Sequence, residues 1–155
     1  MDQKIKKHIE VVNRKAEHLY FLDTRFEAGM VLKGTEIKSI RMGSVNMGDA
    51  FCYLLKGELY VKSLHISPYK FTAHDNHDPM RIRKLLLKKH ELRKIAKKVK
   101  EKGYTIVPTR LFINERGYAK LEVALAKGKK SFDKRDSIKK KDVKRDIERS
   151  RTNRW

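Results

Sequence analysis

The sequence is poor in cysteine and contains no long apolar run. Cys52 is the one cysteine among 155 residues, so the chain cannot form an internal disulfide framework, and a reducing compartment fits it best. No stretch approaches the roughly 20 apolar residues that span a bilayer, and the basic start MDQKIKKHIEVV lacks an apolar run of signal-peptide length. From these absences we expect a soluble, cytoplasmic protein.

Acidic residues are scarce relative to basic ones. Nineteen Asp and Glu stand against 39 Lys and Arg, which gives a formal net charge of +20 and a pI near 10.1. Self-repulsion at this charge opposes compaction, so a structural purpose alone explains the composition poorly. A polyanion that releases counterions when the basic groups bind explains it better. The composition therefore predicts a nucleic-acid partner, ahead of a membrane surface or an acidic protein.

Alternating apolar and polar residues predict a mostly β body. Residues 19–32 predict a strand that bends at Gly29. Residues 51–66 predict a hairpin about a Lys-Gly turn, and residues 104–126 predict a second hairpin with a proline bulge or edge. Several short strands without βαβ alternation favour a closed β-barrel of the oligonucleotide-binding (OB-like) type, with about three flanking helices.

Helical patterns occur in two places. Residues 34–43 predict a short helix capped by Thr35. Between the hairpins, Asp78 and the proline after it predict a helix start. Spaced apolar residues continue that pattern to Gly103 with a break near residues 88–90, so two helices are expected there.

The end of the chain differs in kind from the body. From Lys129 to Arg154, twelve Lys and Arg stand against five Asp and Glu, with few apolar residues. Charged pairs at helical spacing favour a helix, but an isolated helix of this length is marginal in water. We therefore divide the chain into an RNA-binding body, residues 1–130, and a basic C-terminal tail, residues 131–155, disordered when free and helical on its partner.

No segment carries a convincing catalytic motif. The cluster HDNHD, residues 74–78, contains metal-ligand types, but its spacing matches no metal motif, and a polar loop ending in a helix cap is the favoured interpretation. The chain has neither a P-loop nor a GxGxxG motif. We expect no enzymatic activity, no metal and no cofactor.

Three further residues invite opposing interpretations. Phe21 could stack on a base or lie in the interior, and the interior is favoured. Glu27 and Glu36 could simply pair with lysines of this basic chain. They could instead accept hydrogen bonds from base edges or 2′-hydroxyls, which phosphate-seeking lysines cannot do.

Eight short segments together resemble the small protein B (SmpB) family, the SsrA-binding proteins of bacterial trans-translation. They are spread over nearly the whole chain and follow the order of the family. The segments are NRKAEHLY (13–20), FEAGMVLKGTEIKSIRMGSVN (26–46), GELYV (57–61), HISPY (65–69), DPMRIRKLLL (78–87), GYTIVP (103–108), AKGKKSFDKR (126–135) and IKKKDVKRDI (138–147).

The resemblance implies an RNA-binding adaptor with an OB-like barrel. Such an adaptor binds the tRNA-like domain of transfer-messenger RNA (tmRNA) and delivers it, carried by elongation factor Tu, to stalled ribosomes. The tail is then expected to enter the decoding centre, made by 16S rRNA, and the empty mRNA channel. A monomer without catalytic activity or membrane attachment is expected.

Carried over by position, the resemblance also implies two sets of RNA-binding residues. The tmRNA-binding set is Asn13, Arg14, Lys15, Glu27, Gly34, Thr35, Glu36, Lys38, Ser39, Arg41, Lys127, Gly128, Lys129 and Lys130. The ribosome and decoding-centre set is Phe132, Asp133, Lys134, Arg135, Lys139, Lys140, Lys141, Lys144, Arg145 and Arg149. Phe132 stands where relatives often carry tyrosine or histidine, a change that preserves stacking.

Three other functions compete with the adaptor. Composition alone equally fits a basic structural ribosomal protein. A metal nuclease would use His74, Asp75, His77 and Asp78. A membrane-surface binder would need bulky apolar residues that the tail lacks.

Overall fold

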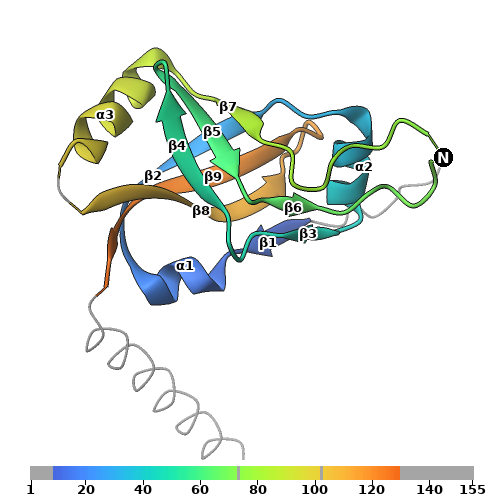
Figure 1. Ribbon diagram of the computed structural model, residues 1–155, viewed down its shortest axis with the longest axis horizontal. Helices are drawn as coiled ribbons and strands as arrows, with labels where there is room; N and C mark the ends of the chain where they lie inside the picture. The colour runs from blue at the N-terminus through green and yellow to red at the C-terminus, as the bar shows by residue number, and fades with distance from the viewer. Residues whose placement is uncertain (1–8, 73, 102, 130–155) are drawn as a thin grey trace, which may run out of the picture.

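Strands form most of the molecule, and the helices lie around them (Figure 1). In the computed structural model, residues 9–72, 74–101 and 103–129 are described. The described elements are, in order, β1 (Glu10–Val12), α1 (Arg14–Leu19), β2 (Tyr20–Met30), α2 (Gly34–Arg41), β3 (Val45–Asn46), β4 (Phe51–Leu55), β5 (Glu58–Lys62), β6 (His65–Ile66), β7 (Arg83–Leu86), α3 (Lys89–Val99), β8 (Tyr104–Ile113) and β9 (Ala119–Gly128).

The main sheet closes into a ring. Its strands follow the order β8-β4-β5-β7-β2-β9, and β9 pairs again with β8. The short β1 pairs with the C-terminal half of β8, while β3 and β6 form a separate two-stranded sheet. The prediction of a mostly β, closed body with about three helices is therefore confirmed for the described residues.

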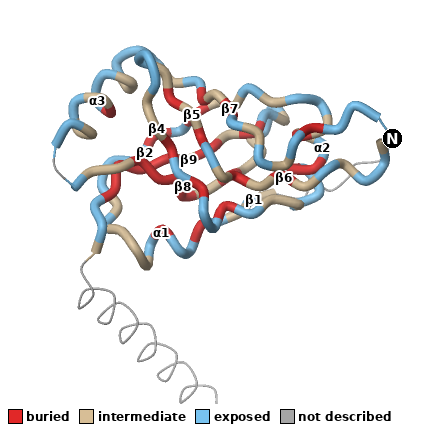
Figure 2. Tube along the Cα trace, viewed as in Figure 1, coloured by how far each residue is buried: buried red, intermediate tan, exposed pale blue. Residues whose placement is uncertain are grey.

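The core fills the interior of this ring. Leu59, Leu85, Leu111 and Leu121 are fully buried and come from four different strands, and Ile40 of α2 packs with them. Figure 2 shows the buried positions concentrated along the strands and on the inner side of α2. One apolar interior thus joins α2 to the sheet.

Both predicted hairpins are confirmed. Lys56 and Gly57 have φ of 51° and 77° between β4 and β5, which suits a two-residue turn with two left-handed residues. The ladder between β8 and β9 shifts register between Pro108 and Arg110, as the predicted bulge requires. Gly29, where a bend is predicted, pairs regularly with both neighbouring strands, so it carries no bulge; β2 is irregular earlier, between Leu22 and Arg25.

One predicted helix is a strand. Residues 83–86 form β7 between β5 and β2, whereas only Lys89–Val99 is helical in that region. Arg83 and Leu85 are buried while Leu86 is half exposed, which is the two-residue period of a strand. The helix prediction failed because it placed Arg83 on the solvent side, whereas Arg83 is buried.

The cap of α2 also differs from the prediction. The N-cap is Lys33, and Thr35 lies inside the first turn. The Lys33 backbone N–H donates to Glu36 Oε1 at 2.8 Å, which satisfies one of the free donors at the helix start. Thr35 Oγ1 instead lies 2.8 Å from His77 Nδ1.

The proposed tail, residues 131–155, lies outside the described residues, as do all ten residues of the predicted ribosome set. Among the helices of the described part, none combines the length and apolar character needed to cross a membrane.

Candidate nucleic-acid interface

The predicted tmRNA-binding residues gather mainly at the two ends of β2. Helix α1 leads directly into this strand, and α2 follows it after a short link, so the two helices lie toward different ends of the ring (Figure 1). At roughly 3.3 Å per residue, a strand of eleven residues is roughly 35 Å long. The structure therefore divides the set into an α1 end and an α2 end.

At the α1 end, the chain is organised by Asn13. Its side-chain oxygen accepts a hydrogen bond from the Ala16 backbone N–H at 3.3 Å, and its amide donates to Pro108 O at 2.8 Å. Arg14 and Lys15 are exposed in the first turn of α1. Lys15 Nζ lies 3.2 Å from Asp49 Oδ1, a contact on the surface that adds little stability.

The end of β9 joins the same region. The Lys129 backbone N–H donates to Leu19 O at 2.9 Å, and Lys129 Nζ donates to Glu17 O at 3.0 Å. Lys127 and Gly128, just before it, are exposed. Lys130 lies outside the described residues. The basic residues of β9 and α1 thus share one surface.

Phe21 also belongs to this surface. It is 52% exposed, so the prediction that it lies in the interior is wrong. Its neighbours Tyr20 and Leu22 pack against a small cluster of buried residues and leave Phe21 outside. Lys129 Nζ lies 5.2 Å from the Phe21 ring centroid, a cation–π distance. An exposed ring beside a cation is suited to stacking on a base.

At the α2 end, the predicted residues separate by burial. Gly34, Lys38 and Arg41 are exposed, whereas Glu36 and Ser39 are fully buried on the inner side of the helix. The exposed side can face an RNA, and the buried side fixes the helix to the ring.

Glu36 lies at the centre of a buried ion-pair cluster. Arg81 Nη2 donates to Glu36 Oε1 at 2.5 Å, and Arg83 Nε donates to Glu36 Oε2. Burial alone would raise the pKa of Glu36, but hydrogen bonds from Arg81, the Lys33 backbone and Arg83, with the charge of Arg83, outweigh it and lower the pKa. Arg83 Nη1 also donates to Leu64 O at 2.6 Å, so the cluster binds α2 to β7 and the β5–β6 segment.

Three residues of the predicted set therefore have a structural role, and their side chains offer no free group to an RNA. The carboxylate of Glu36 is occupied by protein donors, and the side chain of Asn13 is occupied at both ends. Ser39 Oγ is buried and lacks a hydrogen-bond partner within the described part. Contact between RNA and these three side chains would require a rearrangement of the body.

The cluster HDNHD forms a polar loop. His77 is buried, with Nδ1 2.8 Å from Thr35 Oγ1 and Nε2 2.9 Å from Ile66 O. Asp78 accepts from the Met80 backbone N–H at 2.9 Å but begins no helix. In the described ranges, no group of three or more His, Cys, Asp or Glu residues could hold a metal ion.

Glu27 has different surroundings from Glu36. It is exposed on β2 and lies opposite Glu122 of β9 in the ladder. Glu122 is neutralised by Arg25 and Arg110, at 3.0 Å and 3.1 Å, whereas Glu27 forms no ion pair with any described residue. Its carboxylate is therefore available to accept hydrogen bonds from RNA hydroxyl or amino groups.

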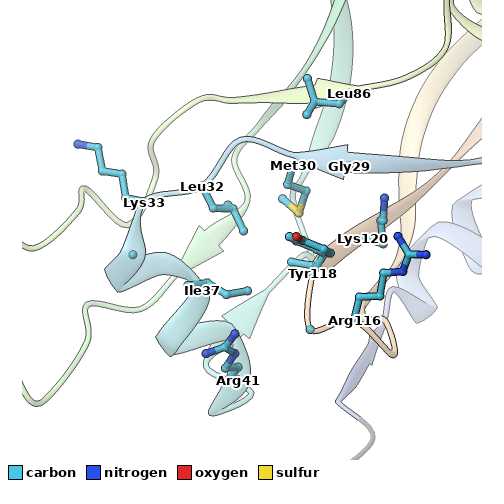
Figure 3. Close-up of a pocket in the computed structure, with 13 residues that line it drawn as sticks. Gly29, Met30, Leu32, Lys33, Ile37, Arg41, Leu86, Arg116, Tyr118 and Lys120 are labelled. Atoms are coloured by element: carbon cyan, nitrogen blue, oxygen red, sulfur yellow. The ribbon is translucent and has the colours of Figure 1, made fainter.

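A groove of about 500 Å³ lies between α2, the end of β2 and the turn joining β8 to β9. Its apolar lining includes Met30, Leu32 and Ile37, and the Tyr118 ring lies beside Met30 (Figure 3). The thirteen lining residues, which contain four cations and no carboxylate, are Gly29, Met30, Leu32, Lys33, Gly34, Ile37, Arg41, Leu86, Arg116, Gly117, Tyr118, Ala119 and Lys120.

Most of these lining residues were missed by the sequence analysis. Arg116 and Tyr118 belong to a hairpin turn more than 70 residues after α2, so nothing local indicates that they face Arg41. The one available signal was the alternation in β9, which places Tyr118 and Lys120 on the outer face beside buried Ala119 and Leu121.

An aromatic pair next to α2, in which Phe71 is 76% exposed and Tyr69 is partly buried, was also missed. Tyr69 and Phe71 meet edge to face at 5.5 Å, and Lys38 Nζ lies 5.4 Å from the Tyr69 ring. Asn76 fixes this loop by bonding both the N–H and the C=O of Tyr69. The exposed side of α2 thus continues onto aromatic surface.

Comparison with known proteins places this architecture in a known group. The family model described as SmpB protein matches residues 10–153. An SsrA-binding protein of Geotalea uraniireducens is 54% identical over 135 residues, covering 87% of this chain and 89% of the relative. An SsrA-binding protein of Parabacteroides distasonis is 52% identical over 150 residues, covering 97% and 98%.

A solved structure agrees with the sequence relatives. A chain described under "tmRNA-SmpB: a journey to the center of the bacterial ribosome" is 49% identical and superposes with a TM-score of 0.68. The match covers 79% of this chain and 86% of that chain.

Proposed function

The chain belongs to the SmpB protein family, and from that membership we propose that it is an RNA-binding adaptor of trans-translation. It binds the tRNA-like domain of tmRNA and brings this RNA to stalled ribosomes, where a peptide tag is added. The observation that carries the proposal is the family match over residues 10–153, together with a 49% identical chain from a structure named for tmRNA and SmpB. A structural ribosomal protein is not favoured, because the relatives carry the name SsrA-binding protein.

The body supplies the tmRNA contacts in this proposal. Exposed cations at the α1 end and at the α2 end meet phosphates. Glu27, without an ion-pair partner in the described part, accepts hydrogen bonds from hydroxyl or base-edge groups. Asn13, Glu36 and Ser39 act indirectly, since their side chains are buried in the body.

The tail supplies the ribosome contacts. Residues 131–155 enter the decoding centre and the empty mRNA channel, where their basic side chains neutralise rRNA. The sequence supports this division into a body of residues 1–130 and a separate tail. The tail is rich in cations and has few apolar residues that could pack against the core of the body.

We further propose that the protein works in the cytoplasm as a monomer, without a catalytic step and together with elongation factor Tu. The chemistry of the tagging reaction then belongs to the ribosome and the RNA. In support, both ring nitrogens of His77 are hydrogen-bonded, to Thr35 and to Ile66, so this side chain is not available as a metal ligand.

The proposal is tested by comparing RNAs and by truncation. Full-length protein should bind the tRNA-like domain of tmRNA much more tightly than an RNA hairpin of equal length at the same physiological salt. A chain ending at Lys130 should keep much of this affinity but lose all tagging of a stalled message. A matched control, Lys94→Gln with Lys97→Gln on α3, should retain both properties. Equal affinity for the two RNAs would refute the adaptor, and equal loss of binding and tagging would refute the division.

A further inference from the structure

We propose that the outer face of β4 and β5 docks a short amphipathic helix of an acidic partner protein. This surface, the β4–β5 face, is formed by Phe51, Tyr53, Leu55, Glu58, Tyr60 and Lys62. It lies apart from both predicted RNA-binding sets, which contain no residue of either strand. Its occupant is therefore additional to the partners of the proposed function.

The β4–β5 face is a sheet surface that no helix of the described part covers. Alternation along the strands places Cys52, Leu59 and Val61 in the core and leaves the residues of the face outside. Helices α1, α2 and α3 lie around other parts of the ring (Figure 1). Phe51 and Leu55, at the two ends of β4, are 41% and 53% exposed. The face is thus an apolar and aromatic surface in contact with solvent.

The side chains of this face suit a protein surface better than an RNA. Tyr53 and Tyr60 stack across the two strands, with ring centroids 5.8 Å apart, and Phe51 lies 6.4 Å from Tyr53. Lys62 and Glu58 are the only charged residues of the face, so it carries no net charge in a chain of net charge +20. A surface for single-stranded RNA combines open ring faces with a groove of cations. A neutral aromatic face instead resembles the centre of a protein–protein interface.

The dimensions of the face fit one helix. Each strand has five residues, so the face is roughly 17 Å long and, with strands about 4.8 Å apart, roughly 10 Å wide. Three turns of helix have a similar length and diameter. Strand β5 is paired on both sides, with β4 and β7, so a partner meets it through side chains and not as an added strand. An interface of this size is typical of a transient partner.

The cations at the two ends of the face indicate an acidic partner. Glu58 pairs with Lys84 of β7 at 3.9 Å. Lys62, at one end of β5, and Lys56, in the turn at its other end, form no ion pair with any residue that the structure describes. Carboxylates at both ends of a docked helix would complement these two lysines. A second copy of the chain is disfavoured, because two molecules of charge +20 repel each other.

Photo-cross-linking in bacterial cells tests the proposal. Phe51 is replaced by the photoreactive residue benzoylphenylalanine in the full chain, and the products of irradiation are identified by mass spectrometry. The expected product joins position 51 to a helix of an acidic protein. The purified protein should then bind the parent chain directly, without RNA, in a titration at physiological salt.

Substitutions on the face decide whether the contact is specific. Leu55→Asp should reduce both the cross-link and the affinity for the purified protein at least about fivefold, since it places a carboxylate at an apolar contact. Val12→Asp puts the same charge at a 48% exposed position on β1 and is the matched control. Lys62→Glu, at an exposed position, should slow association and weaken its salt dependence. It keeps the test valid if Leu55→Asp does not fold.

Several outcomes would overturn the docking face. They are a cross-link to RNA, to a basic protein or to a second copy, no cross-link, and equal losses in Leu55→Asp and Val12→Asp. Both variants should keep the parent's affinity for the tRNA-like domain of tmRNA, and a loss confined to Leu55→Asp would assign the face to RNA and also overturn it. Failure of the parent to prefer this RNA over a hairpin would overturn the proposed function alone.

Discussion

Glu36 and Glu122 each accept hydrogen bonds from two arginines, one inside the protein and the other near its surface. The Glu36 side chain is 0% exposed and its two arginines are 27% and 0% exposed. The Glu122 side chain is 16% exposed, and its arginines are 48% and 34% exposed. The same arrangement of one carboxylate and two guanidinium groups thus occurs once in the protein interior and once in contact with solvent.

The difference shows which cluster matters more for the shape of the groove. Removing one member of a buried ion pair leaves an uncompensated charge, so such a cluster is sensitive to substitution. Exposed pairs are screened by solvent and contribute little. Glu36 joins α2 to β7 and so sets one side of the groove, whereas the arginines on Glu122 neutralise a carboxylate that lies opposite Glu27.

The largest expected effect is that of Glu36→Ala. It leaves Arg83 buried without its carboxylate, so the free energy of unfolding should fall by roughly 3–5 kcal/mol in urea titrations. Glu58→Ala is the control, because it removes an exposed pair with Lys84 at 3.9 Å and should cost only about 0–1 kcal/mol. Equal losses for the two variants would show that burial does not distinguish them. Glu36→Gln serves if the alanine variant does not fold.

Acid should weaken the Glu36 cluster next. The pKa of Glu36 is lowered in the folded state, so its contribution to stability is complete above the unfolded pKa of about 4.3 and is lost as the pH falls toward the folded pKa. Urea midpoints measured from pH 6 downward should therefore fall in the parent and fall less steeply in Glu36→Gln. Parallel curves for both proteins would contradict the linkage.

Glu122→Gln should have a smaller effect. Burial would raise the pKa of Glu122, but the hydrogen bonds from Arg25 and Thr109 and the charge of Arg110 lower it. Because its arginines are partly exposed, we expect a loss of about 0–1 kcal/mol in urea, reduced further at high salt. A loss as large as that of Glu36→Ala would remove the contrast between the clusters.

The smallest effect is expected for Ser39→Ala. Ser39 Oγ is buried without a hydrogen-bond partner in the described part, so its removal deletes an unsatisfied group and should leave stability nearly unchanged or slightly raised. Thr35→Val on the same helix loses a bond to His77 at 2.8 Å and should cost about 0.5–1.5 kcal/mol. Thermal unfolding of the two variants measures the difference, and a large loss for Ser39→Ala would contradict it.

The sequence predicted the parts of this fold that local patterns control. Both hairpins carry their turn residues and their alternation, so β4, β5, β8 and β9 were found. Strand β7 was missed because its buried arginine is acceptable only beside Glu36, which lies 47 residues earlier. A partner so distant in sequence leaves no local signal.

The candidate site was predictable to a similar degree. The resemblance located residues at both ends of β2, but it could not separate exposed from buried side chains on α2. Lys38 and Ser39 are neighbours in the sequence and both belong to the predicted set, yet one is exposed and the other is buried. The groove depends on a turn and a helix brought together by the closed sheet, so it emerges only in three dimensions.

The closed sheet has one narrow seam. β4 meets β8 through the single pair Cys52 and Ile106, whereas β8 and β9 pair from Tyr104 to Ile113. Cys52 is buried at this seam, and burial raises the pKa of its thiol, so it is unreactive while the sheet is closed. The rate at which an added disulfide reagent modifies this thiol therefore measures how often β4 and β8 separate locally. The measurement can be made with and without bound RNA.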